Sequence, residues 1–140
     1  MRLLVTAIFM LAACGFSRAA DWEIPPASLN KTCGQKSSEV ETLGCTDAAY
    51  RKADAELNEV WKKVLAKVAS GNAGQQKPQQ WKDDLIAAEQ AWVAFRDKDC
   101  NGARSDEYWG GSGRDLAVTS CLYEYTVERA KDLKSRYLED

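Results

Sequence analysis

The sequence contains no histidine among its 140 residues. This absence excludes Ser-His-Asp and Cys-His catalysis, histidine-ligated zinc and pH switching by an imidazole. Basic residues are not in excess either, because 21 Asp and Glu outnumber 19 Lys and Arg and the net charge is −2. Nucleic-acid binding requires a basic face, so no nucleic-acid partner is expected. Hydrophobic residues at 45% and charged residues at 29% indicate a soluble globular protein with room for one domain and a leader.

A hydrophobic segment long enough to span a membrane is also missing. The apolar run at residues 3–16 has 14 residues, whereas a membrane-spanning helix needs about 20. The run therefore predicts a signal peptide over residues 1–19. Alternatively, the sequence around Cys14 resembles a bacterial lipobox, in which residues 1–13 are the leader and Cys14 is lipidated. Either leader predicts export to the periplasm or cell envelope, with a lipid on Cys14 as the one possible membrane attachment.

The segment after the leader has little apolar periodicity. Residues 20–37 are expected to be an N-terminal tether, followed by a helical domain over residues 38–140. Loss of the leader removes Arg2 and Arg18 but no acidic residue, so the net charge of the remaining chain becomes −4. The mature protein is therefore more acidic than its precursor.

Five cysteines become an even set once the leader is subtracted. The four that remain are Cys33, Cys45, Cys100 and Cys121. In an oxidising compartment they predict two disulfides, with three possible connectivities. The sequence has no CxxC spacing and no histidine, so neither a metal nor another cofactor is expected.

Apolar residues recur at spacings of three and four in three segments, and no segment alternates like a strand. The first begins at a capping box of Ser38 and Glu41 and ends in the glycine-rich stretch 70–74. The second has Pro78 in its first turn and stops at Asn101-Gly102, and the third is capped by Ser112 or Asp115. The expected apolar stripes are Tyr50, Ala53, Leu57, Val60 or Trp61, Val64 and Val68; then Trp81, Leu85, Ala88, Trp92, Phe95 and Asp99 or Cys100; then Val118, Cys121 or Leu122, Tyr125, Arg129, Leu133 and Tyr137.

Such helices bury their stripes only against one another, so the sequence predicts an all-α fold, a small antiparallel three-helix bundle with two disulfides. In that bundle the start of the first helix, the end of the second and the start of the third share one pole. The four cysteines fall at or next to those ends, so the cysteine pattern and the helix pattern agree.

The run at residues 85–100, Leu-x-x-Ala-Glu-Gln-Ala-Trp-Val-x-Phe-Arg-Asp-x-x-Cys, resembles the central signature of the LprI-like lysozyme-inhibitor domain family. Further matches are Cys45, Asp54-x-x-Leu57-Asn58-x-x-Trp61, Gly110-Gly111-Ser112 and Cys121-x-x-x-Tyr125-Thr126-x-x-Arg129-x-x-x-Leu133. The resemblance covers about residues 33–138 and departs at Trp61, where the family more often has tyrosine. It implies an exported, helical, disulfide-bonded bacterial domain, some of whose relatives inhibit lysozyme.

Two arginines fall on the expected apolar stripes. Arg96, one turn after Trp92, could recognise a sugar or a carboxylate; the structural interpretation is that it packs its stem in the core and pairs with Asp99 or loop carbonyls. Arg129 allows the same interpretation, with bonds to the glycine-rich loop. Gly110 and Gly111 lack the lysine and the spacing of a phosphate-binding loop, so they are expected to form a tight turn before the third helix.

The expected loop from residue 101 to 113 carries Asp106, Glu107, Tyr108 and Trp109 between two cysteines. Aromatic residues dominate interface hot spots, so these four are the candidate partner-binding residues. The alternative is that the two aromatic side chains cover the end of the bundle.

The leading hypothesis is an exported binding protein that protects the cell wall by blocking a basic lysozyme. The alternative is a structural or accessory envelope protein with another partner. An enzyme is not expected, because acid pairs on solvated helix faces lack the apolar pocket that raises the pKa of one carboxyl.

Overall fold

A computed structural model describes residues 26–71, 77–108 and 112–139, and in these residues all regular structure is helical. The helices are α1 (Ala27–Cys33), α2 (Glu39–Ala69), α3 (Pro78–Lys98), the short π-helix η1 (Asp99–Arg104) and α4 (Ser112–Tyr137). The predicted all-α bundle with two disulfides is confirmed. Of the residues described, no helix is both long and apolar enough to cross a membrane.

The ends of α2 follow the sequence signals. The Ser38 side chain accepts a hydrogen bond of 3.2 Å from the Glu41 backbone N–H, which caps the helix. The Glu41 carboxylate reaches back to the N–H and hydroxyl of Ser37 rather than to Ser38. At the other end Gly71 has a φ of +68°, a conformation that disfavours any side chain. The start of the helix at the Ser38 cap and the glycine stop are therefore confirmed, while the return bond of a full capping box goes to Ser37 instead of Ser38. Residues 72–74 lie outside the described part.

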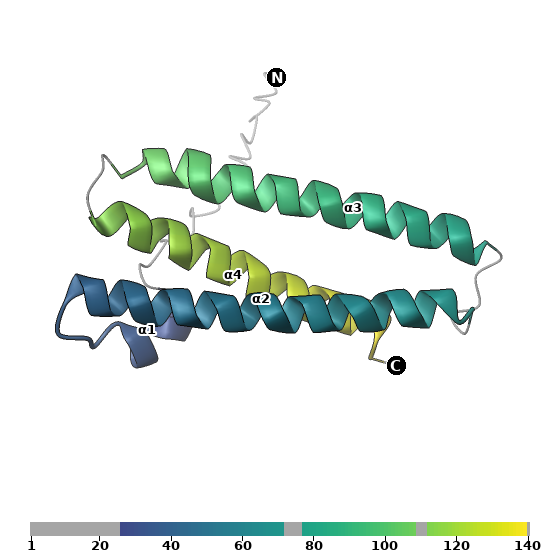
Figure 1. Cartoon of the computed structure of the whole chain (residues 1–140), viewed down its shortest axis with the longest axis horizontal. Helices are drawn as coiled ribbons and strands as arrows, with labels where there is room; N and C mark the ends of the chain where they lie inside the picture. The colour runs from purple at the N-terminus through teal and green to yellow at the C-terminus, as the bar shows by residue number, and fades with distance from the viewer. Residues whose placement is uncertain (1–25, 72–76, 109–111, 140) are drawn as a thin grey trace, which may run out of the picture.

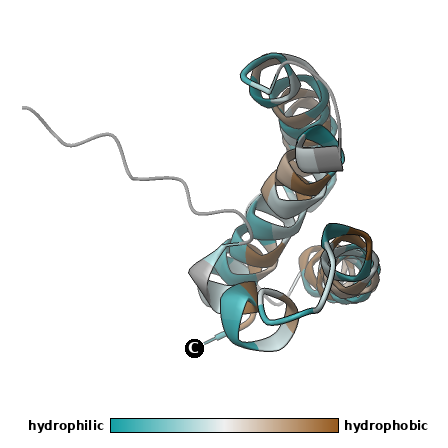
Figure 2. Ribbon diagram, turned by 90° about the vertical axis from the view of Figure 1, so that its left-hand side faces the viewer, coloured by the Kyte–Doolittle hydropathy of each residue, from teal (hydrophilic) through white to brown (hydrophobic). Residues whose placement is uncertain are grey.

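The three long helices lie along a common axis (Figure 1). α2 and α4 run in the same direction, and α3 returns antiparallel to both. Hydrophobic and hydrophilic residues lie on different sides of the helices, as expected of amphipathic helices (Figure 2). The buried core is shared by α2, α3 and α4, and comprises Leu57, Val60, Val64, Val68, Leu85, Ala130 and Leu133. Trp61, Trp81, Trp92, Tyr137 and Leu138 pack against it from partly buried positions.

The buried face of α3 is turned from the expected one. Leu85, Glu89 and Arg96 are its buried residues, whereas Ala88 is exposed and Phe95 is 53% exposed. Glu89 thus occupies a buried position that was not on the expected apolar stripe, whereas the burial of Arg96 agrees with the structural interpretation of that arginine. The reason is that both charges find partners inside the bundle, which removes the usual penalty for burial.

Part of the expected tether is folded. α1 lies within residues 20–37, and its Leu29 and Cys33 are buried. Cys33 is disulfide-bonded to Cys45 of α2, which holds this short helix beside the start of α2. Figure 1 shows α1 at the same end of the molecule as the start of α2, the end of α3 and the start of α4. We call this end the cysteine pole.

Candidate functional site

Two disulfides tie the cysteine pole together. Cys33 bonds Cys45 and Cys100 bonds Cys121, with Cα–Cα distances of 5.5 and 5.6 Å. Of the three connectivities that the sequence left open, the structure has the one in which the first cysteine bonds the second and the third bonds the fourth. Asp99 lies near the sulfurs of Cys100 and Cys121, the one such group of potential metal ligands among the described residues. Because these sulfurs are bonded to each other, they offer no thiolate to a metal.

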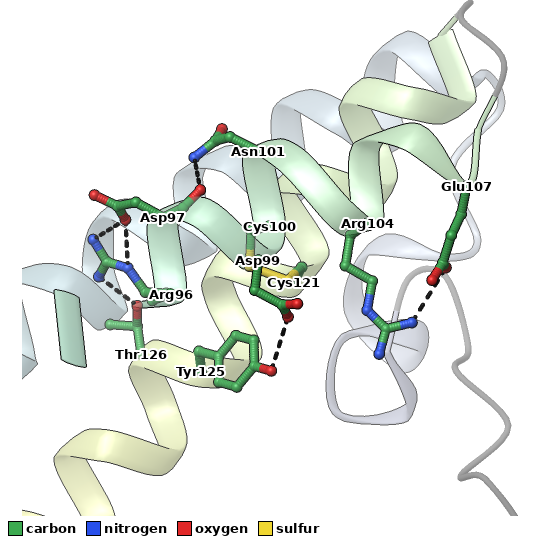
Figure 3. Close-up of a disulfide and its surroundings, with 10 residues drawn as sticks. All are labelled: Arg96, Asp97, Asp99, Cys100, Asn101, Arg104, Glu107, Cys121, Tyr125 and Thr126. Atoms are coloured by element: carbon green, nitrogen blue, oxygen red, sulfur yellow. Dashed lines mark hydrogen bonds and ion pairs between the residues drawn. A yellow bond between two sulfur atoms is a disulfide. The ribbon is translucent and has the colours of Figure 1, made fainter. Parts of the chain in front are cut away.

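The sequence predicted that the second helix stops at Asn101-Gly102, and this prediction is wrong. The helix continues as η1, with wider helical turns, and the Asn101 side chain donates a hydrogen bond of 2.9 Å to the Asp97 carbonyl (Figure 3). The Cys100–Cys121 bond holds this continuation against α4. An Asn-Gly pair is a helix stop only when no tertiary link opposes it, and here the disulfide provides one.

Next to this disulfide, Tyr125 of α4 contacts both η1 and α3. Its hydroxyl donates a hydrogen bond of 2.9 Å to Asp99, and its ring meets Phe95 edge to face at 5.6 Å. Burial raises the pKa of Tyr125, and the hydrogen bond to Asp99 raises it further. Asp99 was expected to pair with Arg96; that expectation is wrong, because Asp99 accepts from Tyr125 instead (Figure 3).

Arg96 is 7% exposed and bonds to all three long helices. Its guanidinium donates to Thr126 of α4 at 3.2 Å and to Asp97 of α3 at 2.9 Å, and lies 3.7 Å from Asp54 of α2. The same group lies over the Trp92 ring, 5.3 Å from its centre. With its donors engaged inside the protein, Arg96 supports the structural interpretation rather than recognition of a sugar.

Arg129 reaches the same tryptophan from α4. Its guanidinium lies 5.5 Å from the centre of the Trp92 ring and donates to one Glu89 oxygen at 2.9 and 2.7 Å. It also bonds Asp132 at 3.0 Å. The expected bonds to the glycine-rich loop are replaced by these acidic partners. Arg129 over the Trp92 ring and bonded to Glu89, together with the contacts of Arg96 to Thr126 and Asp54, therefore attaches α3 to α2 and α4.

The candidate partner-binding residues follow η1. Asp106 and Glu107 are exposed, and Glu107 forms an ion pair of 3.3 Å with Arg104 (Figure 3). Tyr108 is half-buried, and its backbone N–H donates to the Ser105 carbonyl at 3.3 Å. Trp109, Gly110 and Gly111 lie outside the described residues, so the geometry does not choose between a binding wedge and a cover for the bundle.

A groove that the sequence reasoning missed opens between α2 and α4 at the cysteine pole. Its volume is about 490 Å³, within the range of ligand pockets. Val40, Leu43 and Gly44 line it from α2, and Val118 lines it from α4. The available signal was an apolar pair at residues 40 and 43, beside the buried stripe of α2 rather than on it.

A smaller hollow lies between α1 and α4. It measures about 200 Å³ and is lined by Ser28, Tyr123, Glu124 and Glu128, among others. Burial raises the pKa of Glu124, and the neighbouring Glu128 carboxylate raises it further. The hollow is smaller than ordinary ligand pockets of about 300–1,000 Å³, so it does not make a substrate site.

Comparison with known proteins adds two findings. The family model described as "Lysozyme inhibitor LprI" matches residues 30–133, a span that includes all four bonded cysteines. An uncharacterized protein of Rhizobium meliloti (strain 1021) is 31% identical over 144 residues, covering 96% of this chain and 94% of the relative. No solved structure matches the chain.

Proposed function

The chain belongs to the LprI lysozyme-inhibitor family, and from that premise we propose that it is an exported, non-enzymatic protein that binds a basic lysozyme and prevents it from cutting the cell wall. The observation that carries this proposal is the family match, which extends from α1 through nearly all of α4. The buried charges Arg96, Arg129 and Glu89 bond to side chains on neighbouring helices, which is consistent with structural roles for them in a binding protein.

Charge supports a basic partner. The full sequence carries a net charge of −2, and the chain without residues 1–19 would carry −4. An acidic protein attracts a basic one over a Debye length of roughly 8–10 Å, which raises the rate of association and makes it sensitive to salt. Charge alone does not select lysozyme among basic proteins; the family does.

We place the contact at the cysteine pole. The candidate residues Asp106, Glu107 and Tyr108 follow η1 there, and Trp109 comes next in the sequence. The Cys100–Cys121 bond fixes the segment that precedes Asp106, which would reduce the conformational entropy lost by that segment when a partner binds.

The proposed location is the periplasm or cell envelope. Two disulfides require an oxidising compartment for their formation. The apolar run at residues 3–16 supplies the export signal, cleaved after residue 19 or used to lipidate Cys14. Mass spectrometry of the protein recovered from the envelope distinguishes these two, because only the lipoprotein retains Cys14 with an acyl mass.

The test is an inhibition titration with the oxidised chain, residues 20–140, against a c-type lysozyme lysing cell walls. The proposal predicts dose-dependent inhibition, and reversal of charge in D106K/E107K weakens it if these residues form the contact. Matched reversal at Asp83 and Asp84 on α3 controls for the change in net charge. No inhibition of c-type, g-type or bacterial lytic enzymes would favour the alternative of an accessory envelope protein, whose partner a pull-down from envelope extract would recover.

A further inference from the structure

The groove between α2 and α4 is lined by three larger apolar side chains, of which Val40 is largely exposed and Leu43 and Val118 are half-buried. Val40 is 75% exposed, although it lies in the first turn of a long, well-capped helix. Together with Leu43 and Val118 it forms an apolar floor in a hollow of about 490 Å³. Concave apolar surfaces of this kind mark binding sites more often than scattered exposed residues do.

The rim of the groove is acidic. Asp47 lines it from α2 and Asp115 from the first turn of α4, and no Lys or Arg lines it among the described residues. Asp47 pairs with Arg51 one turn along at 2.7 Å, but its side chain remains 41% exposed. An apolar floor with a carboxylate on each wall is complementary to a lysine or arginine side chain, whose stem is hydrocarbon and whose tip is cationic.

We infer that this groove is the anchor site for lysozyme, receiving a basic side chain that projects from the enzyme's surface. The inference rests on the proposed function and deepens it, because it names the surface that binds and the chemistry that it recognises. It also places the binding energy in a preformed hollow between two helices rather than only in the segment after η1. An apolar hollow that becomes filled and desolvated by one projecting side chain is a common structure of an interface hot spot.

Gly44 allows a test that separates binding from folding. It lies inside α2, its φ is not positive, and a Cβ built on it meets no atom within 4 Å. A side chain can therefore begin at this position without a clash at its Cβ, and alanine or leucine here improves on the poor helix propensity of glycine. G44L places a bulky side chain in the groove, whereas G44A gains the helix propensity while leaving most of the groove open.

The experiment is isothermal titration calorimetry of the oxidised chain, residues 20–140, with a c-type lysozyme. The inference predicts that G44L binds at least about tenfold more weakly than wild type, while G44A stays within about twofold. A66L adds the same side chain to an exposed position at the far end of α2 and should bind as wild type does. D47K should weaken binding by about tenfold, and D84K, with the same change of charge on α3, by much less.

The outcomes separate the inference from the proposed function. If wild type and G44L bind lysozyme equally, the groove is not the anchor and the proposed function stands. If wild type does not bind at all, both fail. If sedimentation shows a wild-type dimer that G44L abolishes, the groove holds a second copy of this chain and the inference is wrong.

Discussion

Removal of the Glu89 carboxylate should destabilise the bundle through Arg129. The two side chains are only 11% and 18% exposed, and Arg129 donates two hydrogen bonds to Glu89. In E89A the guanidinium would lose both and keep its bond to Asp132. Breaking a fully buried ion pair costs about 3–5 kcal/mol, and the retained partner and residual exposure reduce this to about 2–3 kcal/mol.

The assay is urea unfolding of the oxidised protein, followed by circular dichroism. With a slope of about 1.5 kcal/mol per molar, the unfolding midpoint of E89A should fall by roughly 1–2 M. E59A is the matched control, because Glu59 forms an ion pair with Lys62 that is largely exposed to solvent, and its midpoint should not move. R129M and the double variant complete a cycle, and the loss in E89A should be much smaller once Arg129 is gone. Equal midpoints for E89A and E59A would refute the role assigned to this pair.

Three further predictions concern stability. Replacement of either cysteine pair by serine should lower the free energy of unfolding by about 3 kcal/mol. The loss should be slightly larger for Cys100–Cys121, because its separation of 21 residues exceeds the 12 of Cys33–Cys45. Equal stability of either variant and wild type in urea would contradict this. G71A should destabilise the fold by about 1 kcal/mol, because the φ of Gly71 is +68°. G44A should stabilise the fold by about 0.5–1 kcal/mol, because Gly44 lies inside a helix with open space around its Cβ position. Melting temperatures that shift in the same direction in both variants would contradict these predictions. Burial raises the pKa of Glu124 above its ordinary 4.5, so the folded state holds that proton more tightly and stability should fall as the pH rises from 4.5 through the folded pKa. E124Q should remove this slope from the pH profile of unfolding, and an unchanged slope would refute the assignment.

The fold followed from local signals because each of them coincided with a tertiary requirement. The Ser38 cap, the Gly71 stop and Pro78 at the first helical turn set the ends of α2 and α3. The antiparallel arrangement expected of three amphipathic helices brought those ends to one pole, and the four cysteines fell at or next to the same ends, where the structure bonds them.

The errors share one physical cause, which is that each depends on a partner elsewhere in the chain that a local pattern does not show. α3 buries Glu89 because Arg129 of α4 neutralises it, and that partner is 40 residues away in the sequence. The continuation of α3 into η1 likewise depends on Cys121, 21 residues after Cys100. α1 lacks a side-chain cap and has only seven residues, so its disulfide and its buried Leu29 hold it, not its own propensity.

The candidate site was predicted less fully than the fold. The acidic and aromatic residues after η1 stand out in the sequence by composition alone. The groove does not, because it exists only where two helix starts lie side by side, with Val40 and Leu43 from one and Val118 from the other. A concave surface between elements distant in sequence has no local signature.

The central claim is that this chain, held at its cysteine pole by two disulfides, inhibits lysozyme. The most direct measurement is the rate of cell-wall lysis by a c-type lysozyme, titrated in parallel with the oxidised chain and with the same chain reduced and alkylated. We predict that inhibition by the oxidised chain saturates near one equivalent and that the reduced chain loses most of it. A lysis rate unaffected by excess oxidised chain would contradict the account, and equal inhibition by both forms would contradict the role of the disulfides.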